Sequence, residues 1–302
     1  MGRLDPALAP LAEARTDLSP EVLGAVQASI DRRRREAAKA LDAPGVAIAG
    51  ARISVGRRTI AVRIYRGGPS PAPAIVYCHS GAFVLGNLDT DQIQCVELAR
   101  RARCTVISMD YRLAPEHPYP AGIDDAVAVL KWAAAMAAEL DIDARRVAVA
   151  GSSAGGAYAA LLAQYAAAGS VPPIVFQLLH QPVLDDRWTG SKEEFADTPG
   201  LDGPAAAAMW RHYLGGRDIP AAVPARVTDL TGLAPAFITC SDLDPLRDEA
   251  LDYARRLRDA GIATEQHMFP GTCHGFDSLL GEWEISQQLF ALQGAALRRA
   301  LH

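Results

Sequence analysis

The sequence predicts an α/β fold with a mostly parallel central sheet and helices on both of its faces. From about residue 46 onward, strand-like apolar runs alternate with helix-like runs, which is the pattern of parallel strands joined by helices. Half of the 302 residues are hydrophobic, enough for a sizeable core, and α/β folds reach this length as one unit. The candidate functional residues all follow strands, where ligands of such folds bind.

The N-terminal segment, residues 1–42, is rich in Ala and Arg and differs from the rest of the chain. A helix start is indicated at Ser19-Pro20-Glu21. Apolar residues follow it at helical spacing: Val22, Val26 and Ile30. Because the segment is too short to form a domain, we expect it to pack on the main body, residues 43–302.

The elements of the main body follow from its apolar runs and from the residues that interrupt them. Two strands over 46–53 and 58–65 flank Val55-Gly56, which predicts a hairpin. The further strands that we expect cover 74–79, 105–109, the run ending at Gly151, 174–180, 235–240 and 264–269. The expected helices cover 89–103, 124–140, 154–168, 246–260 and 284–301, the last of them amphipathic.

The alternation is interrupted once, at about residues 184–227. This long stretch is broken by Gly and Pro, and it is interpreted as an inserted lid over the strand ends. Its large aromatic side chains either line an apolar pocket or pack on the sheet: Trp188, Phe195, Trp210 and Tyr213.

The charge balance excludes several classes of protein. With 30 Lys and Arg against 35 Asp and Glu, the formal net charge is −5, so no nucleic-acid partner is expected. The one basic cluster, Arg32 to Arg35, is interpreted as a solvated helix face. The first residues lack the apolar core of a signal peptide, and no run of about 18 apolar residues predicts a membrane span. We therefore expect a soluble, cytoplasmic protein.

The cysteines do not indicate a metal site or a disulfide framework. There are five, and none of them forms a Cys-x-x-Cys pair, so neither a metal nor a cofactor is expected. Cys78, Cys104 and Cys240 lie in or beside apolar strands, which is typical of buried small side chains in a reducing compartment. Cys273 precedes His274, but a thiol nucleophile there is less favoured than Ser153.

Gly151 to Gly155 has the pattern of a catalytic corner between a strand and a helix. A Ser at such a corner is forced into a tight, strained turn, so its neighbours two positions away must be very small. The helix that follows directs free N–H groups and a partial positive charge at the same point. The Gly-x-Ser-x-Gly frame therefore predicts Ser153 as a nucleophile; the alternative is a small-residue turn without chemistry.

A Ser hydroxyl is a poor nucleophile until a base takes its proton. Of the histidines that follow Ser153, His274 lies just past a strand and between small residues, which favours it as the base. His180 also ends a strand and is the second choice.

The base needs a carboxylate that fixes its tautomer and stabilises the imidazolium. Asp242 and Asp244 both follow the strand over 235–240. Position alone leaves the two open, because Asp244 before Pro245 is also typical of a helix N-cap. The order Ser, Asp, His is the order expected for an α/β-hydrolase.

The reaction of a Ser nucleophile also needs backbone donors for the oxyanion. The N–H of Ala154, directly after Ser153, is one candidate. The loop after an early strand, His79-Ser80-Gly81-Ala82-Phe83, is the other, because its small residues let N–H groups approach a substrate oxygen. The alternative is an ordinary strand-to-helix turn.

Taken together, these motifs resemble the hormone-sensitive-lipase-like family of α/β-hydrolases, the bacterial carboxylesterase and lipase branch. The loop at His79 resembles the family's His-Gly-Gly-Gly-Phe/Trp motif, and the corner at Ser153 resembles its Gly-Asp-Ser-Ala-Gly-Gly. Three further stretches match in the same order: 111–121, 244–248 and 274–276. The resemblance covers about residues 70–280.

The resemblance implies a role for each candidate. It implies Ser153 as the nucleophile, Asp244 rather than Asp242 as the acid, and His274 as the base. It implies that the N–H groups of Gly81, Ala82 and Ala154 form the oxyanion hole. It also implies that residues 1–42 and the insertion at about 184–227 form a helical cap.

The chain departs from the family pattern at three positions. Ser80 and Ala82 replace two of the family's three glycines, and a Cβ limits φ there. Ser152 replaces the usual Asp before the nucleophile. His79 is expected to organise its loop rather than carry a proton.

The predicted function is a serine carboxylesterase that hydrolyses short- to medium-chain acyl esters through an acyl-enzyme. The expected partner is a small-molecule ester, and a homodimer is possible through the last helix or the edge strand beside it. One alternative is a binding protein on a disabled hydrolase scaffold, which the presence of His274 disfavours. Amide hydrolysis or deacetylation would use the same residues. A dinucleotide-dependent oxidoreductase is excluded because Gly151 to Gly156 does not fit Gly-x-Gly-x-x-Gly.

Overall fold

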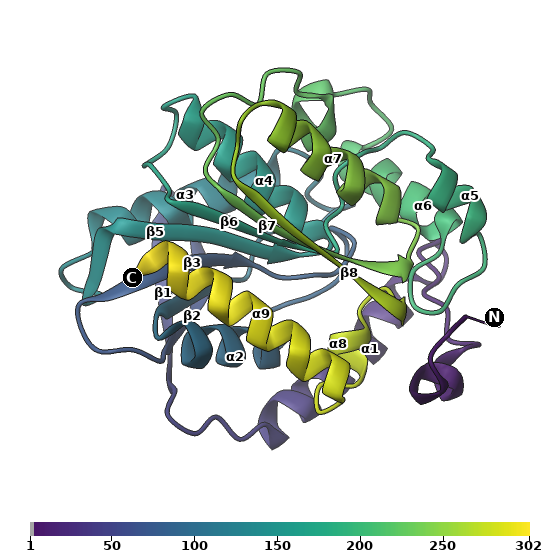
Figure 1. Ribbon diagram of the computed structural model, residues 1–302, viewed down its shortest axis with the longest axis horizontal. Helices are drawn as coiled ribbons and strands as arrows, with labels where there is room; N and C mark the ends of the chain where they lie inside the picture. The colour runs from purple at the N-terminus through teal and green to yellow at the C-terminus, as the bar shows by residue number, and fades with distance from the viewer. Residues whose placement is uncertain (1–2) are drawn as a thin grey trace.

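A mixed eight-stranded sheet organises residues 3–302, which are the residues that the computed structural model describes (Figure 1). Its strand order is β1-β2-β4-β3-β5-β6-β7-β8. The strands are β1 (Ala47–Val55), β2 (Arg58–Arg66), β3 (Ala72–Cys78), β4 (Thr105–Met109), β5 (Ile142–Ser152), β6 (Phe176–His180), β7 (Ala236–Leu243) and β8 (Thr264–Cys273). The pairs β1–β2 and β2–β4 are antiparallel and the others parallel, so the predicted mostly parallel sheet is confirmed.

The hairpin predicted around Val55-Gly56 is also present. Val55 pairs with Arg58, and Gly56 between them has a φ of +61°, a left-handed conformation that glycine adopts without strain. The expected bounds of the parallel strands differ from the observed ones by a few residues. The largest difference is in β8, which continues to Cys273 and so brings the next residue, His274, directly to the end of the sheet.

Helices cover both faces of the sheet (Figure 1). Helices α2 (Gln92–Ala102) and α9 (Glu284–Leu301) lie on one face, and α3 (Ala121–Ala135), α4 (Ala154–Ala167) and α7 (Arg247–Asp259) lie on the other. Each face has its own apolar cluster, because strands buried on both sides bury side chains in both directions. Each fully buried Leu or Val in these clusters stabilises the fold by about 1.5–3 kcal/mol.

The N-terminal segment packs on the end of β8 and on the helices beside it. A 3-10 helix (Pro6–Leu11) is capped by the Asp5 carboxylate, which accepts from the Ala7 N–H at 2.8 Å. Leu8 is fully buried among residues of β8, of α9 and of the short helix α8 (Phe276–Leu279). The Asp5 N–H donates to the carbonyl of Gly271 at 2.9 Å, which connects the segment to the last residues of β8.

Helix α1 (Leu23–Ala40) carries the basic cluster, and its environment differs from the prediction at one position. Arg32, Arg33 and Arg35 are exposed, as a solvated face requires. Arg34 is half-buried and donates to Thr90 Oγ1 at 3.0 Å. The sequence pattern could not single out Arg34, because its partner is distant along the chain.

The insertion at 184–227 lies where the parallel strands end, and it contains α5 (Gly190–Glu194) and α6 (Gly203–Leu214) (Figure 1). Two short 3-10 turns, Pro220–Ala222 and Pro224–Arg226, complete it. A buried ion pair between Lys192 of α5 and Glu249 of α7, at 2.8 Å, joins the insertion to the main body. Three of its four large aromatic side chains are buried, whereas Trp188 is 53% exposed, so packing accounts for most of them.

None of the helices within residues 3–302 is long and apolar enough to cross a lipid bilayer.

Candidate active site

The corner between β5 and α4 places Ser153 in a strained conformation. Ser153 has φ 54° and ψ −119°, a combination that non-glycine residues adopt only when their surroundings enforce it, and it is 5% exposed. A Cβ at Gly151 would lie 2.1 Å from the carbonyl oxygen of Gly155, and one at Gly155 would lie 2.0 Å from that of Cys78. Both glycines of the frame are therefore required by the close approach of neighbouring backbone.

The loop after β6 holds the same corner from the other side. The Ser153 N–H donates to the carbonyl of His180 at 2.9 Å, and the Val183 N–H donates to the carbonyl of Ser153 at 3.0 Å. These two bonds fix both peptide groups of Ser153, so the backbone from which its side chain projects keeps one position relative to the sheet.

The structure brings together Ser153, His274 and Asp244. His274 Nε2 lies 2.9 Å from Ser153 Oγ, and His274 Nδ1 lies 2.8 Å from Asp244 Oδ2. A carboxylate can only accept, so Nδ1 carries the proton and Nε2 is free to accept from the Ser hydroxyl. The base candidate therefore has the tautomer that proton abstraction from a Ser requires.

Asp244 has both of the contacts that the sequence left as alternatives. Its Oδ1 accepts from the Leu246 N–H at 2.8 Å, in the manner of a helix cap, while its Oδ2 faces His274. The carboxylate of Asp242 points elsewhere, with Oδ2 at 3.7 Å from Arg3 Nη2.

The electrostatics of the site raise the pKa of His274. Burial lowers the pKa of His274, but the charge of Asp244 and its hydrogen bond raise it more, with smaller contributions from Asp277 and Glu249. The net effect is a pKa above the ordinary value of 6.5. Such a base holds the proton that it takes from Ser153 more firmly than an isolated imidazole would.

The other histidines that follow Ser153 have other partners. The His180 ring contacts Thr239 Oγ1 at 2.7 Å and Asp277 Oδ1 at 3.0 Å, so it approaches Ser153 only through its backbone carbonyl. The remaining three contact groups away from the corner: His212 the carbonyl of Leu18, His267 the carboxylate of Glu265, and His302 the carbonyl of Ala102.

The loop after β3 presents two backbone N–H groups that are free to bind an oxyanion. Gly81 has φ 136° and Ala82 φ 54°, and within residues 3–302 their N–H groups have no hydrogen-bond acceptor. The N–H of Ala154 is the first in α4 and lacks an intrahelical partner by position. Gly81 must be glycine, since a Cβ there would lie 2.0 Å from the carbonyl oxygen of Leu85, whereas Ala82 adopts a left-handed φ despite its Cβ.

Ser80, which replaces a glycine of the family pattern, is bound to Asp91. The Ser80 N–H donates to Asp91 Oδ2 at 2.7 Å, and its hydroxyl donates to Oδ1 at 2.8 Å. The Tyr77 hydroxyl also donates to Oδ2, at 3.1 Å. The added side chain is thus held by a buried carboxylate.

His79 has the surroundings of a residue that organises its loop. Its ring stacks on Tyr111 at 4.1 Å, and Nδ1–H donates to the carbonyl of Ser80 at 2.7 Å. Burial lowers the pKa of His79 to about 3, so its ring stays neutral. The Tyr111 hydroxyl donates to the His79 carbonyl at 2.8 Å, which fixes the start of the loop.

The insertion contacts this loop through an aromatic stack. Tyr213 of α6 lies parallel to Phe83 with 4.0 Å between ring centroids, and Trp210 packs at 5.4 Å from the same ring. The aromatic side chains that the sequence offered as pocket lining thus support the residues beside Ala82.

Cys273 does not have the environment of a nucleophile. It is buried, and this burial raises the pKa of its thiol to about 12, so that it is not a thiolate near neutral pH.

Sequence reasoning missed one polar residue at this site, Gln181. Its amide contacts Ser241 Oγ at 2.6 Å and the backbone on both sides of His274. The only signal in the sequence is a polar residue between His180 and Pro182, directly after a buried strand.

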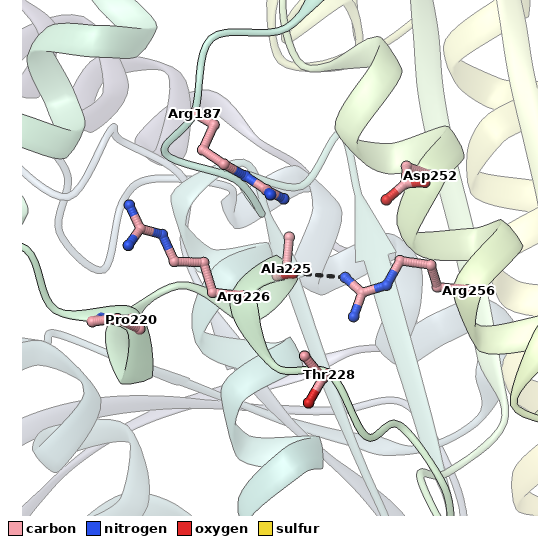
Figure 2. Close-up of a pocket in the computed structure, with 7 residues that line it drawn as sticks. All are labelled: Arg187, Pro220, Ala225, Arg226, Thr228, Asp252 and Arg256. Carbon is pink, nitrogen blue, oxygen red and sulfur yellow. Dashed lines mark hydrogen bonds between the residues drawn. The ribbon is translucent and has the colours of Figure 1, made fainter.

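A cavity of about 740 Å³ lies apart from these residues, on the side of the insertion that faces α7 (Figure 2). Its arginines are already engaged: Arg187 with Asp185 at 2.6 Å, Arg226 with Asp186 at 2.6 Å, and Arg256 with the carbonyl of Ala225 at 2.7 Å. The lining residues are Arg187, Pro220, Ala225, Arg226, Thr228, Asp252 and Arg256, none of which belongs to the Ser153 site.

Comparison with known proteins agrees with this architecture. A family described as the alpha/beta hydrolase fold matches residues 75–278. The chain is 42% identical over 252 residues to Esterase LipI of Mycobacterium tuberculosis, covering 80% of this chain and 79% of that protein. It is 43% identical over 237 residues to Carboxylesterase NlhH of the same species, covering 76% and 74%. The crystal structure of esterase LipW from Mycobacterium marinum superposes with a TM-score of 0.98 at 57% identity, covering 100% of this chain and 97% of that one.

Proposed function

The chain belongs to the alpha/beta hydrolase family, in its hormone-sensitive-lipase-like branch, and is a carboxylic ester hydrolase; we propose that it works through a Ser153-His274-Asp244 triad and an acyl-enzyme. The observation that carries the proposal is the pair of contacts made by His274, 2.9 Å to Ser153 Oγ and 2.8 Å to Asp244 Oδ2. Nucleophile, base and carboxylate within hydrogen-bond reach of one another are the arrangement that activates a Ser.

In the first step, Ser153 Oγ forms a bond to the ester carbonyl carbon while His274 Nε2 takes the hydroxyl proton. The carbonyl electron pair moves onto the oxygen and creates an oxyanion. The imidazolium then gives its proton to the alcohol oxygen, the bond from carbon to that oxygen breaks, and the acyl group stays on Ser153.

In the second step, a water molecule follows the same route. His274 takes its proton, the water oxygen bonds to the acyl carbon, and the bond to Ser153 Oγ breaks as the proton returns to that oxygen. The products are a carboxylic acid and the free enzyme. Throughout, Asp244 stays ionised and keeps the Nδ1 proton of His274 in place.

We further propose that the N–H groups of Gly81, Ala82 and Ala154 bind the oxyanion in both steps. They are backbone groups, so the side chains of Ser80 and Ala82 do not remove them. The support for this assignment is that all three N–H groups lack a hydrogen-bond acceptor among the described residues, 3–302. One such donor contributes about 10²–10³ in kcat in other hydrolases.

The N-terminal segment and the insertion are proposed to form one cap over the site. Two contacts between them support this: the Gly200 N–H donates to the carbonyl of Ala14 at 3.0 Å, and His212 Nε2–H donates to that of Leu18 at 2.8 Å. Gly200 also lies directly against the backbone of His274, where a Cβ would come within 3.0 Å of its carbonyl oxygen.

The proposed substrates are short- to medium-chain acyl esters, on the strength of the family resemblance. The rates of p-nitrophenyl esters with acyl chains from 2 to about 16 carbons would report the depth of the acyl site together with catalysis. We expect a maximum at the short end.

The test of the triad is Ser153→Ala, with Ser152→Ala as its matched control. Without the hydroxyl no acyl-enzyme forms, so turnover of p-nitrophenyl butyrate falls by about 10⁶-fold. Ser152→Ala, which does not change the Ser position of the glycine frame, stays within about threefold of the wild type. Activity retained in Ser153→Ala would overturn the proposal, and loss in Ser152→Ala alone would move the nucleophile to that residue.

A further inference from the structure

Gln181 lies directly after β6 and is buried among all three loops that carry the proposed triad. Its side-chain Oε1 accepts from the Gly275 N–H at 2.7 Å, and its Nε2 donates to the carbonyl of Cys273 at 3.3 Å. These two backbone groups flank His274 on either side. One amide therefore holds both peptide neighbours of the proposed base.

The orientation of this amide is fixed by its partners. The Gly275 N–H can only donate and the Cys273 carbonyl can only accept, so exchanging the oxygen and nitrogen of Gln181 would oppose like groups at both contacts. Nε2 also donates to Ser241 Oγ at 2.6 Å, and Ser241 Oγ in turn donates to the Cys273 carbonyl at 3.1 Å. Ser241 lies three residues before Asp244, so the network also reaches the loop of the proposed acid.

The backbone of the same residue is tied to the nucleophile corner. Gln181 follows His180, whose carbonyl accepts from the Ser153 N–H, and the Gln181 N–H donates to the carbonyl of Thr239 at 2.7 Å. Gln181 has φ 43°, a left-handed conformation that is costly for a residue with a Cβ. The contacts that Gln181 makes at this position therefore outweigh the conformational cost of its backbone.

The glycines beside His274 give its loop little backbone restraint, so contacts from other elements contribute to its position. Gly271 and Gly275 on the two sides of His274 have φ of +69° and +74°, and both are free of the restraint that a Cβ would impose. Loss of the Gln181 amide would leave the Gly275 N–H without its acceptor, while the Cys273 carbonyl would keep the Ser241 hydroxyl as a donor. The loop would then move to satisfy the Gly275 N–H.

We propose that Gln181 is a positioning residue for His274: its amide clamps the backbone at 273 and 275 and so sets the distance from the imidazole to Ser153 and Asp244. The inference rests on the proposed triad, because it gives Gln181 a role only if His274 is the base. The amide of Gln181 binds backbone and Ser241 Oγ, and not the side chains of the triad, so its proposed action is through the position of His274.

The test is Gln181→Met, which keeps the length of the side chain and removes both backbone contacts. We expect kcat for p-nitrophenyl butyrate to fall by about 10- to 100-fold, the effect of displacing a catalytic group by about 1 Å. We expect KM to change by less than about threefold, because no substrate contact is removed. Gln181→Asn, which is too short to reach both backbone groups, should lower kcat in the same way and decides the matter if Gln181→Met does not fold.

The matched control is Gln177→Met on β6, the strand that leads into Gln181. Gln177 is equally buried and donates to the carbonyl of Ala234 at 2.8 Å, but it contacts no loop of the site. We expect a comparable loss of thermal stability with kcat within about twofold of the wild type.

Three results would overturn the inference: folded Gln181 variants with kcat within about twofold of the wild type, an equal fall of kcat in Gln177→Met, or a rise in KM with kcat unchanged. The same assay on Ser153→Ala keeps the two proposals apart. If Ser153→Ala is inactive and the Gln181 variants are not impaired, only the role of Gln181 fails; if Ser153→Ala is active, the triad itself fails.

Discussion

The corner at Ser153 and the loop at His274 reach their geometry in opposite ways. At the corner, the small neighbours Gly151 and Gly155 allow backbone to approach within distances that no Cβ would permit, so the corner packs tightly against β3 and β6. At the loop, flanking glycines remove restraint, and the position is held from outside by Gln181 and by the N-terminal segment, through the Asp5 contact to Gly271. The proposed nucleophile thus depends on small neighbours in the sequence together with backbone from β3 and β6, whereas the glycines around the proposed base leave its placement to contacts from distant residues.

Among the predictions that follow, the largest effect is expected for Asp244, the proposed acid, which contacts His274. Asp244→Asn should lower kcat by about 10⁴-fold, because the amide would favour the wrong tautomer of His274. Its Oδ1 can still accept from the Leu246 N–H, so the stability of the fold should change little. Kinetics with p-nitrophenyl butyrate would measure the loss.

Asp242→Asn is the control for the acid, since Asp242 faces Arg3 instead of the imidazole. Its kcat should remain within about threefold of the wild type. An active Asp244→Asn beside an inactive Asp242→Asn would reverse the assignment. Asp244 would then serve only to cap the backbone that follows it.

The next largest effect is expected from Gly155→Ala at the Ser153 corner. In Gly155→Ala the new Cβ would lie 2.0 Å from the Cys78 carbonyl oxygen and 2.6 Å from that of His79. Both the corner and the loop after β3 must therefore shift. A displacement of this kind should cost about 100-fold in kcat/KM, or prevent folding. Gly24→Ala, with no atom within 4 Å of the added Cβ, should keep full activity and gain a few tenths of a kcal/mol, roughly the helix preference of Ala. A fully active Gly155→Ala would show that the corner tolerates a wider backbone.

A smaller effect tests whether the N-terminal segment supports the base loop. Leu8 is fully buried against Phe269, Cys273 and Phe276, so Leu8→Ala should lower the free energy of unfolding by about 2–4 kcal/mol. We also expect kcat to fall by roughly threefold to tenfold, because Gly271 loses the support of this segment. Denaturant titration and steady-state kinetics would measure the two changes.

Ile48→Ala provides the comparison for Leu8→Ala, because Ile48 is 42% exposed on the edge strand β1. It should change stability by less than about 0.5 kcal/mol. If Leu8→Ala destabilised the protein no more than Ile48→Ala, the segment would not be a support of the loop.

The smallest effect concerns pH. His274 must be neutral to accept the Ser153 proton, so kcat/KM should rise with pH through the pKa of His274 in the free enzyme. Burial alone would lower this pKa, but Asp244 raises it by its charge and hydrogen bond, so the midpoint of the rise should lie above 6.5. A midpoint clearly below 6.5 would mean that the carboxylate is not charged or not in contact. A pH series at limiting substrate concentration measures this.

Much of the fold could be predicted from the sequence, because strands and helices depend on local pattern. The strand over 105–109 was predicted at the observed residues, and the hairpin at Val55-Gly56 is present. The place of β4 between β2 and β3 could not be predicted, since strand order depends on how the layers pack and leaves no local signal.

The site divides in the same way. Local reasoning could select His274 from its strand end and its small neighbours, yet it left Asp242 and Asp244 open, because both residues follow the strand expected over 235–240. The observed β7 continues to Leu243, so that Asp242 lies within the strand and Asp244 directly after it. Local reasoning gave Gln181 no role and assigned Arg34 to a solvated face. The partners of both residues lie more than 50 positions away along the chain.

By itself the sequence determined the α/β class, the strand-to-helix corner and the residue types of the chemistry, because each of these depends on neighbours within a few positions. Only the tertiary structure decided which groups meet: His274 with Ser153 across 121 residues, His274 with Asp244 across 30, and Gln181 with Gly275 across 94. The physical reason is that parallel strands bring their carboxyl ends to one edge of the sheet. The side chains that meet there are set by strand order and packing, which no local pattern contains.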